Sequence, residues 1–213
     1  GVDVVVDNGR TFSRRTTDRY DLIFSSLADT QAASTQGAYV LSENHLYTVE
    51  AFEAYWDRLT DDGVCTTVSA AGWGENVSRL VGTMAEALEN KGVTEPEKHL
   101  ILVITPPKEN GMQGMCVAFS KQPVTDETLT RVRGACDKLG FALVLPVPYA
   151  INADPELIAR ISGLIKASTR QAVLAAAIPD LSPLHDDRPY LFYSVKRGLF
   201  FKMLLNWNDA STG

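Results

Sequence analysis

Polar side chains that could take part in chemistry follow two short apolar runs near the start of the chain. Asp7 and Asn8 come directly after residues 2–6, and Ser26 ends a second run, with Asp29 three positions later. If both runs are buried strands, these side chains lie at the carboxyl ends of strands, where open α/β sheets bind ligands. A carboxylate there could hold a substrate. The simpler alternatives stay open, since Asp7 also fits an Asx turn and Asp29 a solvated turn.

Other familiar chemical sites are missing from the sequence. His45 has no recognisable acid or nucleophile partner, and His99 and His185 are expected to be structural. No group of His, Cys, Asp and Glu has metal-ligand spacing, and no Gly-x-Ser-x-Gly elbow is present. A Gly-Trp-Gly turn lacks the third glycine of a dinucleotide loop, which would fall at Val77.

Alternating strand and helix patterns around these residues predict an α/β domain. A loop over residues 27–41 is long enough to act as a lid, and an amphipathic helix then begins near Asn44 and ends at Gly63. The next strand, residues 64–68, should lie parallel to the strand that precedes the loop. Further helices are expected at 11–18, 75–91, 126–139, 155–165, 169–178 and 198–205, an antiparallel strand pair at 99–104 and 115–119, and a strand at 141–145.

Composition limits the class of protein. With 213 residues, 45% of them hydrophobic, the chain can bury one substantial core. The net charge of −6 argues against binding to nucleic-acid phosphates and is compatible with an amine-bearing ligand. Cys65, Cys116 and Cys136 are expected to be buried, reduced thiols, which fits a cytoplasmic protein. No apolar run approaches the ~20 residues that cross a bilayer, although the apolar segment at 198–205 could lie against a membrane or a partner.

Four stretches together resemble one protein family. They are residues 7–10 after a strand, 20–23 entering another, 46–52 on the following helix and 186–189 near the end. These stretches resemble the polyamine aminopropyltransferases, the spermidine and spermine synthases, which share the class I S-adenosylmethionine methyltransferase fold. The similarity is greatest to bacterial spermidine-synthase-like proteins in which such a domain is joined to membrane-spanning segments.

The resemblance implies a fold and a cofactor. Residues 1–195 would form a Rossmann-like domain with a mixed, mostly parallel sheet and helices on both faces, and residues 196–213 an apolar helix and tail. The cofactor would be S-adenosylmethionine or its decarboxylated form, and the acceptor a polyamine.

The resemblance also implies roles for individual residues. Asp7 and Asn8 fall where the family contacts the adenine ring, and the loop at 27–41 falls on a gate over the substrates. Asp29 matches the carboxylate that anchors the amine. Tyr39 and Tyr47 could line the substrate pocket, although Tyr47 also fits a packing position beside the helix start.

Two features depart from the family pattern. The carboxylate that accepts the amine's proton is replaced by Ser26, and a serine has no proton affinity suited to that task. Ser26 and Asp29 are the expected catalytic positions. The Gly-rich loop that holds the nucleotide precedes Asp7 in the family and is not in this sequence, so we expect an N-terminally truncated domain with an incomplete cofactor site. Two classes of function remain: an aminopropyltransferase-like or methyltransferase-like enzyme, or a catalytically inactive binding or assembly module, attached to a membrane protein or forming a homodimer.

Overall fold

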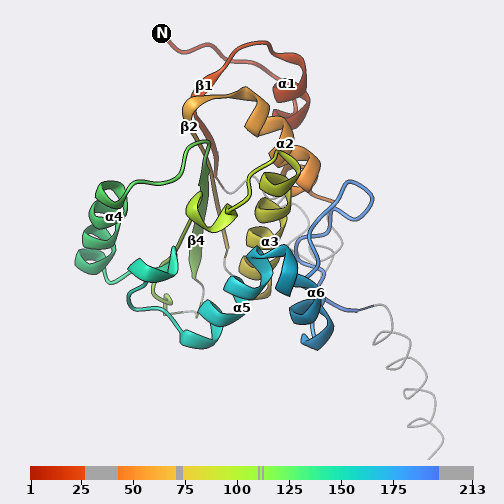
Figure 1. The fold of residues 1–213 in the computed structure, drawn as a ribbon. Helices are drawn as coiled ribbons and strands as arrows, with labels where there is room; N and C mark the ends of the chain where they lie inside the picture. The colour runs from red at the N-terminus through yellow and green to blue at the C-terminus, as the bar shows by residue number, and fades with distance from the viewer. Residues whose placement is uncertain (27–42, 71–73, 110, 112, 197–213) are drawn as a thin grey trace, which may run out of the picture.

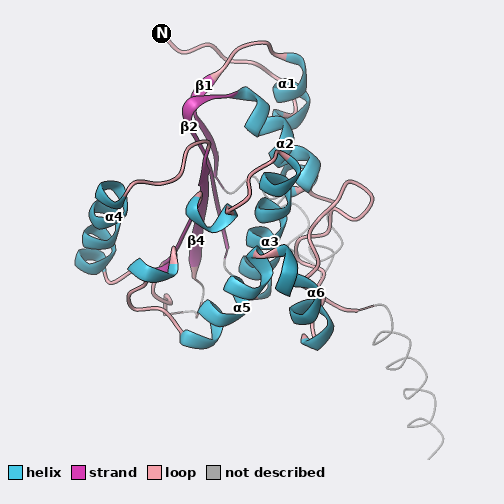
Figure 2. Ribbon diagram, in the orientation of Figure 1, coloured by secondary structure: helices cyan, strands magenta, loops and turns pink. Residues whose placement is uncertain are grey.

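The computed structural model describes residues 1–26, 43–70, 74–109, 111 and 113–196. In this part of the chain a five-stranded sheet forms the middle layer of an α/β fold. Its elements are α1 (Gly9–Arg15), β1 (Tyr20–Ser26), η3 (His45–Tyr47), α2 (Val49–Arg58), β2 (Leu59–Ala70), α3 (Glu75–Asn90), η4 (Pro96–Lys98), β3 (Leu100–Ile104), β4 (Gly114–Ser120), α4 (Asp126–Leu139), β5 (Ala142–Leu145), η5 (Val147–Tyr149), α5 (Pro155–Ile165) and α6 (Ala167–Ala176). Helices α2, α3 and α5 lie on one side of the sheet and α4 on the other, which confirms the expected layers (Figures 1 and 2).

The sheet is mixed, with strand order β1-β2-β4-β3-β5. Strands β1 and β2 are parallel, as the strand–helix–strand pattern predicts, and β3 and β4 form the expected antiparallel pair. The β2–β4 and β3–β5 pairs are also antiparallel, so the described strands are not mostly parallel. The cause is the direct connection from β3 to β4, which reverses the chain without a crossover helix.

Strand β1 is at the edge of the sheet, and the prediction that it is buried is wrong. Leu22 and Phe24 are 58% and 59% exposed, and Ile23 is the residue of the strand that packs against the core. Residues 2–6, also expected as a strand, form none in the described structure, and Val2, Val4 and Val6 are exposed. An edge strand offers unpaired backbone groups and a free apolar face.

The helix before β2 ends earlier than the sequence predicts. It stops at Arg58, and Gly63 lies inside β2 instead of capping the helix. At this point the β1–β2 register shifts, and a Cβ on Gly63 would lie 2.9 Å from both the Tyr20 carbonyl oxygen and the Leu59 Cβ. Gly63 is therefore needed for a close approach of two strands, not for a left-handed turn. The first helix, α1, likewise covers Gly9–Arg15 instead of residues 11–18.

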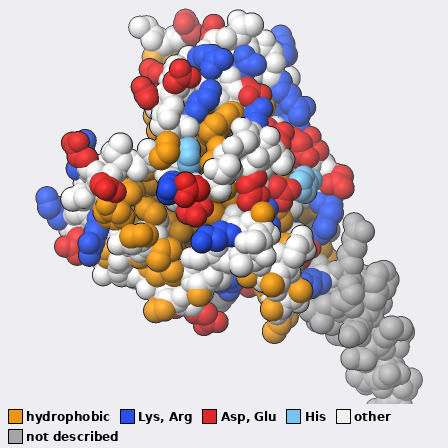
Figure 3. Space-filling model, viewed as in Figure 1, with side chains coloured by type: hydrophobic (Ala, Val, Ile, Leu, Met, Phe, Trp, Pro, Cys, Tyr) orange, Lys and Arg blue, Asp and Glu red, His pale blue; other side chains and the backbone are white. Residues whose placement is uncertain are grey.

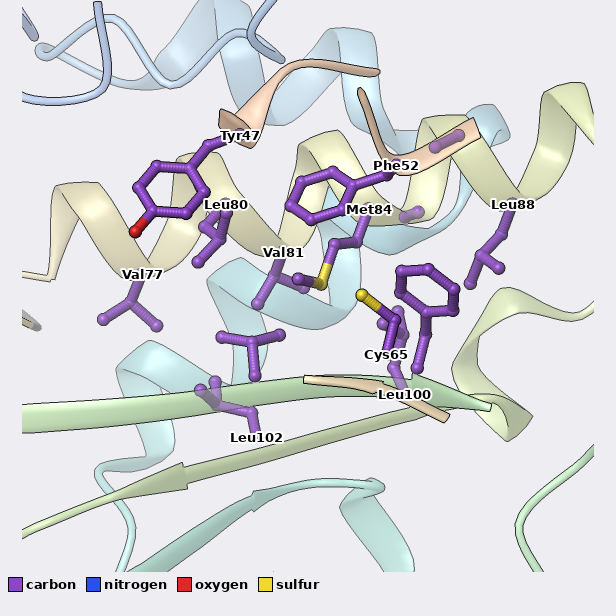
Figure 4. Packing of buried hydrophobic residues seen from close by; sticks show 14 of the residues in the cluster. Tyr47, Phe52, Cys65, Val77, Leu80, Val81, Met84, Leu88, Leu100 and Leu102 are labelled. Carbon is purple, nitrogen blue, oxygen red and sulfur yellow. The ribbon is translucent and has the colours of Figure 1, made fainter. Parts of the chain in front are cut away.

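The core lies between the sheet and the helices α2 and α3. Figure 4 shows α3 side chains, spaced as the sequence predicts, pointing at Phe52 from α2 and at Leu100 and Leu102 from β3. Cys65 on β2 and Cys136 on α4 are buried free thiols, as expected, and Cys116 is half-buried. No helix in the described ranges is both long and apolar enough to pass through a bilayer.

A buried arginine on α3 organises the C-terminal segment. Arg79 is 2% exposed, and its Nη1 donates hydrogen bonds to the carbonyl oxygens of Leu191 and Tyr193, both at 2.8 Å, and to that of Tyr190. Burial lowers the pKa of the guanidinium to about 10, so it is still charged at neutral pH. The charge is stabilised by backbone dipoles of a segment more than a hundred residues away.

We predict that Arg79→Met lowers the free energy of unfolding by about 2–4 kcal/mol, because three buried or partly buried carbonyl groups lose their donor. Urea denaturation measures this change. The control is Arg131→Met on the exposed face of α4, which should change the value by less than about 0.5 kcal/mol. Equal effects of the two substitutions would show that the carbonyl contacts are not stabilising.

Candidate functional site

A pocket of about 450 Å³ lies between α1, β1, η3 and α2. Ser26, at the carboxyl end of β1, is part of its lining, as is the neighbouring Ser25. Aromatic and apolar side chains make up most of the remaining wall: Phe12, Tyr20, Leu22, Ile23, Phe24, Leu46 and Tyr55. The pocket therefore joins a strand end to the helix that follows Asp7 and Asn8.

The polar pair before α1 starts the helix. The Asn8 side chain accepts hydrogen bonds from the amides of Arg10, at 3.0 Å, and Thr11, at 3.4 Å, which is the geometry of an N-cap. Asp7 accepts from the Asn8 amide at 2.8 Å and pairs with Arg15 at 3.2 Å. The hydrogen bond to the amide two residues on, which defines an Asx turn, is therefore made by Asn8 and not by Asp7, and contact of this pair with an adenine ring stays a prediction.

Contacts with the C-terminal turn hold α1 in place. Arg10, whose side chain is 10% exposed, donates from Nη2 to Asp186 Oδ2, and Thr48 Oγ1 donates to Asp186 Oδ1 at 2.8 Å. Partial burial acts to raise the pKa of Asp186, but the hydrogen bonds from Arg10 and Thr48 outweigh it and lower the pKa. Arg188 in the same turn donates to Asp180 at 2.6 Å, so Asp186 and Arg188 both form ion pairs with residues outside the turn.

The phenol ring of Tyr55 forms part of the pocket lining. Tyr55 is 5% exposed, and its hydroxyl donates to the Leu46 carbonyl at 3.2 Å, which ties η3 to α2. Burial raises the pKa of Tyr55, so the group keeps its proton at neutral pH. Across the pocket mouth, the rings of Phe12 and Tyr20 lie 6.4 Å apart.

The structure places the predicted site residues in different environments. Ser26 lines the pocket, whereas Tyr47 is fully buried in the core beside Val77 and Leu80 (Figure 4). Asp29 and Tyr39 lie outside the described residues. The packing alternative for Tyr47 is therefore the one the structure supports.

The described lining of the pocket offers hydroxyl and backbone groups but no charged side chain. Among the residues that the structure describes, no carboxylate, imidazole or ammonium group lines it, and its polar atoms are hydroxyls and backbone groups. No cluster in the same ranges could hold a metal ion. A flat, largely apolar group would fill such a space without leaving a charge unpaired.

Sequence reasoning did not find the residues that position the pocket. Arg10, Thr48 and Asp186 meet although Arg10 and Asp186 are 176 positions apart. His45 is partly exposed, and its Nε2 lies 3.4 Å from Glu43, an acidic neighbour that was not identified from the sequence. The buried His99 contacts the Ser120 carbonyl at 2.9 Å. The Asp186-Asp187-Arg188 run indicates a charged turn, but no neighbouring residue in the sequence indicates that Arg10 is the partner of Asp186.

A larger cavity of about 560 Å³ lies at the opposite end of the sheet, beside α4. Its walls include Leu129, Val147, Pro148 and Ile165, and Figure 3 shows hydrophobic side chains gathered between α4 and the rest of the molecule. None of the predicted site residues that the structure describes lies in this cavity.

Comparisons with known proteins found similarity to solved structures only. No protein-family model matches the chain, and no curated protein matches it. A probable spermidine synthase from Corynebacterium glutamicum is 16% identical, with a TM-score of 0.49 over 85% of this chain and 53% of that chain. The spermidine synthase from Thermotoga maritima is 16% identical, with a TM-score of 0.36 over 82% and 49%. The chain thus spans about half the length of these structures.

The Asp186 contacts predict a defined pH dependence. A carboxyl group whose pKa is lower in the folded state stabilises the fold above its unfolded pKa of 3.8, and this contribution is lost as pH falls through the folded pKa. We expect Asp186→Asn to lower the free energy of unfolding by about 1–2 kcal/mol at neutral pH, since 37% of the carboxylate side chain is exposed. The difference between the two proteins should shrink below about pH 4.

Chemical denaturation at several pH values measures this difference, and Asp187→Asn is the matched control. A difference that stays constant down to about pH 2 would rule out the ionised Asp186 as its source.

Proposed function

We propose that this chain is a spermidine-synthase-like domain that binds S-adenosylmethionine or its decarboxylated form in the pocket between α1 and β1. The observation that carries the proposal is the meeting of two segments: Ser26 at the end of β1, and the helix that starts directly after Asp7 and Asn8. The sequence resemblance assigns Asp7 and Asn8 to contact with the adenine ring, and residues 20–26 to the strand whose end presents the active site. The aromatic wall fits the adenine part of the cofactor, while no described group in the wall offers a charge to the rest of it.

The cofactor would supply a carbon activated by a neighbouring sulfonium. In the proposed reaction this chain holds the amine acceptor and removes its proton, because a protonated amine cannot attack. Asp29 is the proposed base and amine anchor, with Tyr39 assigned to the substrate side. Ser26 can hydrogen-bond the amine but cannot hold its proton at neutral pH. A polyamine acceptor and a cytoplasmic location belong to the same proposal.

A second candidate function is an inactive binding or assembly module, in a homodimer or attached to a membrane protein. Two observations favour it. The described pocket wall lacks a base, and Leu22 and Phe24 expose an apolar face on an open sheet edge.

Isothermal titration calorimetry with the two nucleotides tests the binding claim. We predict binding heat with at least one of them, and about tenfold weaker binding in Phe12→Ala because the adenine loses an aromatic contact. Phe141→Ala, which removes a ring outside the pocket, is the control. Absence of heat with both nucleotides, in a sample shown by circular dichroism to be folded, would refute the proposal.

The substitution Ser26→Asp distinguishes the two candidate functions. In the enzyme, Ser26→Asp should raise the rate of aminopropyl transfer to a diamine by about 10²-fold, since a positioned base replaces a hydroxyl. Ser120→Asp, at the other end of the sheet, should leave the rate unchanged. If the nucleotide binds but Ser26→Asp transfers no faster than the parent chain, the inactive module is the better description.

A further inference from the structure

A third cavity, near the far edge of the sheet, contains Arg160, which has no hydrogen-bond or ion-pair partner among the described residues. The cavity has a volume of about 460 Å³ and lies between α3, α5 and the strands β3 and β5. Its lining includes Gly74, Ile104, Val144, Leu157 and Arg160. Because β1 and β5 occupy opposite edges of the sheet, this cavity is separate from the pocket that contains Ser26.

Arg160 makes no hydrogen bond or ion pair with any residue that the structure describes, and its Nε is buried. A guanidinium that is partly removed from water without an acceptor is unfavourable, and a bound anion would relieve this. The planar fork of five N–H donors matches a carboxylate, which accepts two parallel hydrogen bonds. From this geometry we propose that the cavity binds a small organic monocarboxylate through Arg160.

Gly74 allows the Arg160 guanidinium to come close to the N-terminus of α3. A Cβ on this residue would lie 2.9 Å from Arg160 Nη2, and its φ of +88° also favours glycine. Gly74 is the N-cap of α3 and provides no side-chain acceptor for the first amides of the helix. A carboxylate on Arg160 would therefore also lie near the positive end of a 16-residue helix.

The remaining lining residues determine which kind of molecule can carry the carboxylate. Val77, Ile104, Val144 and Leu157 are apolar, and the volume lies within the usual range of about 300–1,000 Å³ for small-molecule sites. Asp154 also lines the cavity, where its carboxylate caps α5 by accepting from the Glu156 amide at 2.9 Å. This negative charge disfavours a multiply charged anion such as phosphate. Because Gln113 and Asn152 make part of the lining polar, the walls fit a single carboxylate on a small, partly apolar body.

Titration calorimetry with hexanoate, benzoate and inorganic phosphate tests this site. We expect the chain to bind hexanoate or benzoate more tightly than phosphate, and Arg160→Gln to weaken that binding at least about tenfold. Arg58→Gln is the matched control, because Arg58 is also partly buried with an unpartnered Nε but shares its pocket with Glu50, Glu53 and Asp57. The Arg58→Gln variant should bind hexanoate and benzoate as tightly as the parent chain does.

A second measurement needs no variant. On addition of hexanoate to the parent chain, the NMR signals of the Arg160 Nε–H and of the Val77 amide should shift together, while those of the Leu129 amide on α4 stay in place. Unchanged Arg160 and Val77 signals, binding of phosphate as tight as that of hexanoate, or equal affinities of the parent chain and Arg160→Gln would each overturn the proposal.

Discussion

A guanidinium removed from water must find acceptors for its N–H groups, and Arg79 finds them in the main chain of the C-terminal segment. Since α3 runs through the core, this requirement brings residues 180–193 back across the helices. His185 holds the same segment from another side, with its ring nitrogens 3.2 Å from Glu50 and 3.1 Å from Glu86. The C-terminal segment is therefore part of the folded core and not an appendage to it.

The position of this segment decides where α1 lies. A helix of seven residues is too short to be stable alone, so α1 depends on tertiary contacts. Asp186 supplies the main one by accepting hydrogen bonds from Arg10 and from Thr48 at the start of α2. With α1 fixed in this way, Phe12 faces the edge strand and closes the pocket that Ser26 lines. The candidate site is thus lined by residues between positions 9 and 55 and is held in place by a turn near the other end of the chain.

Local signals in the sequence predict the elements well and their partners poorly. Thr125 and Gly140 bound α4, and Asp154 before a proline begins α5, because caps act through neighbouring backbone groups. The prediction that Gly63 caps a helix was wrong, because Gly63 allows a close approach to Tyr20 on another strand. Tyr20 lies far from it in the sequence, so no local signal indicates this role. The prediction that β1 is buried was wrong for the same reason. The apolar pattern of a strand does not reveal whether other strands pair with both of its edges. In the site, Ser26 could be placed at a pocket from its strand, whereas the partner of Arg10 could not.

The central claim is that the C-terminal turn positions α1 over β1. Native-state hydrogen exchange of the Phe12 and Thr16 amides, which donate to the carbonyls of Asn8 and Phe12 at 2.8 and 2.9 Å, measures the stability of that arrangement. In Asp186→Asn we predict that both amides exchange about tenfold faster, while the Leu129 amide in α4 keeps its rate. Equal exchange of Phe12 and Thr16 in the two proteins would show that α1 holds its place without Asp186, and would contradict the claim.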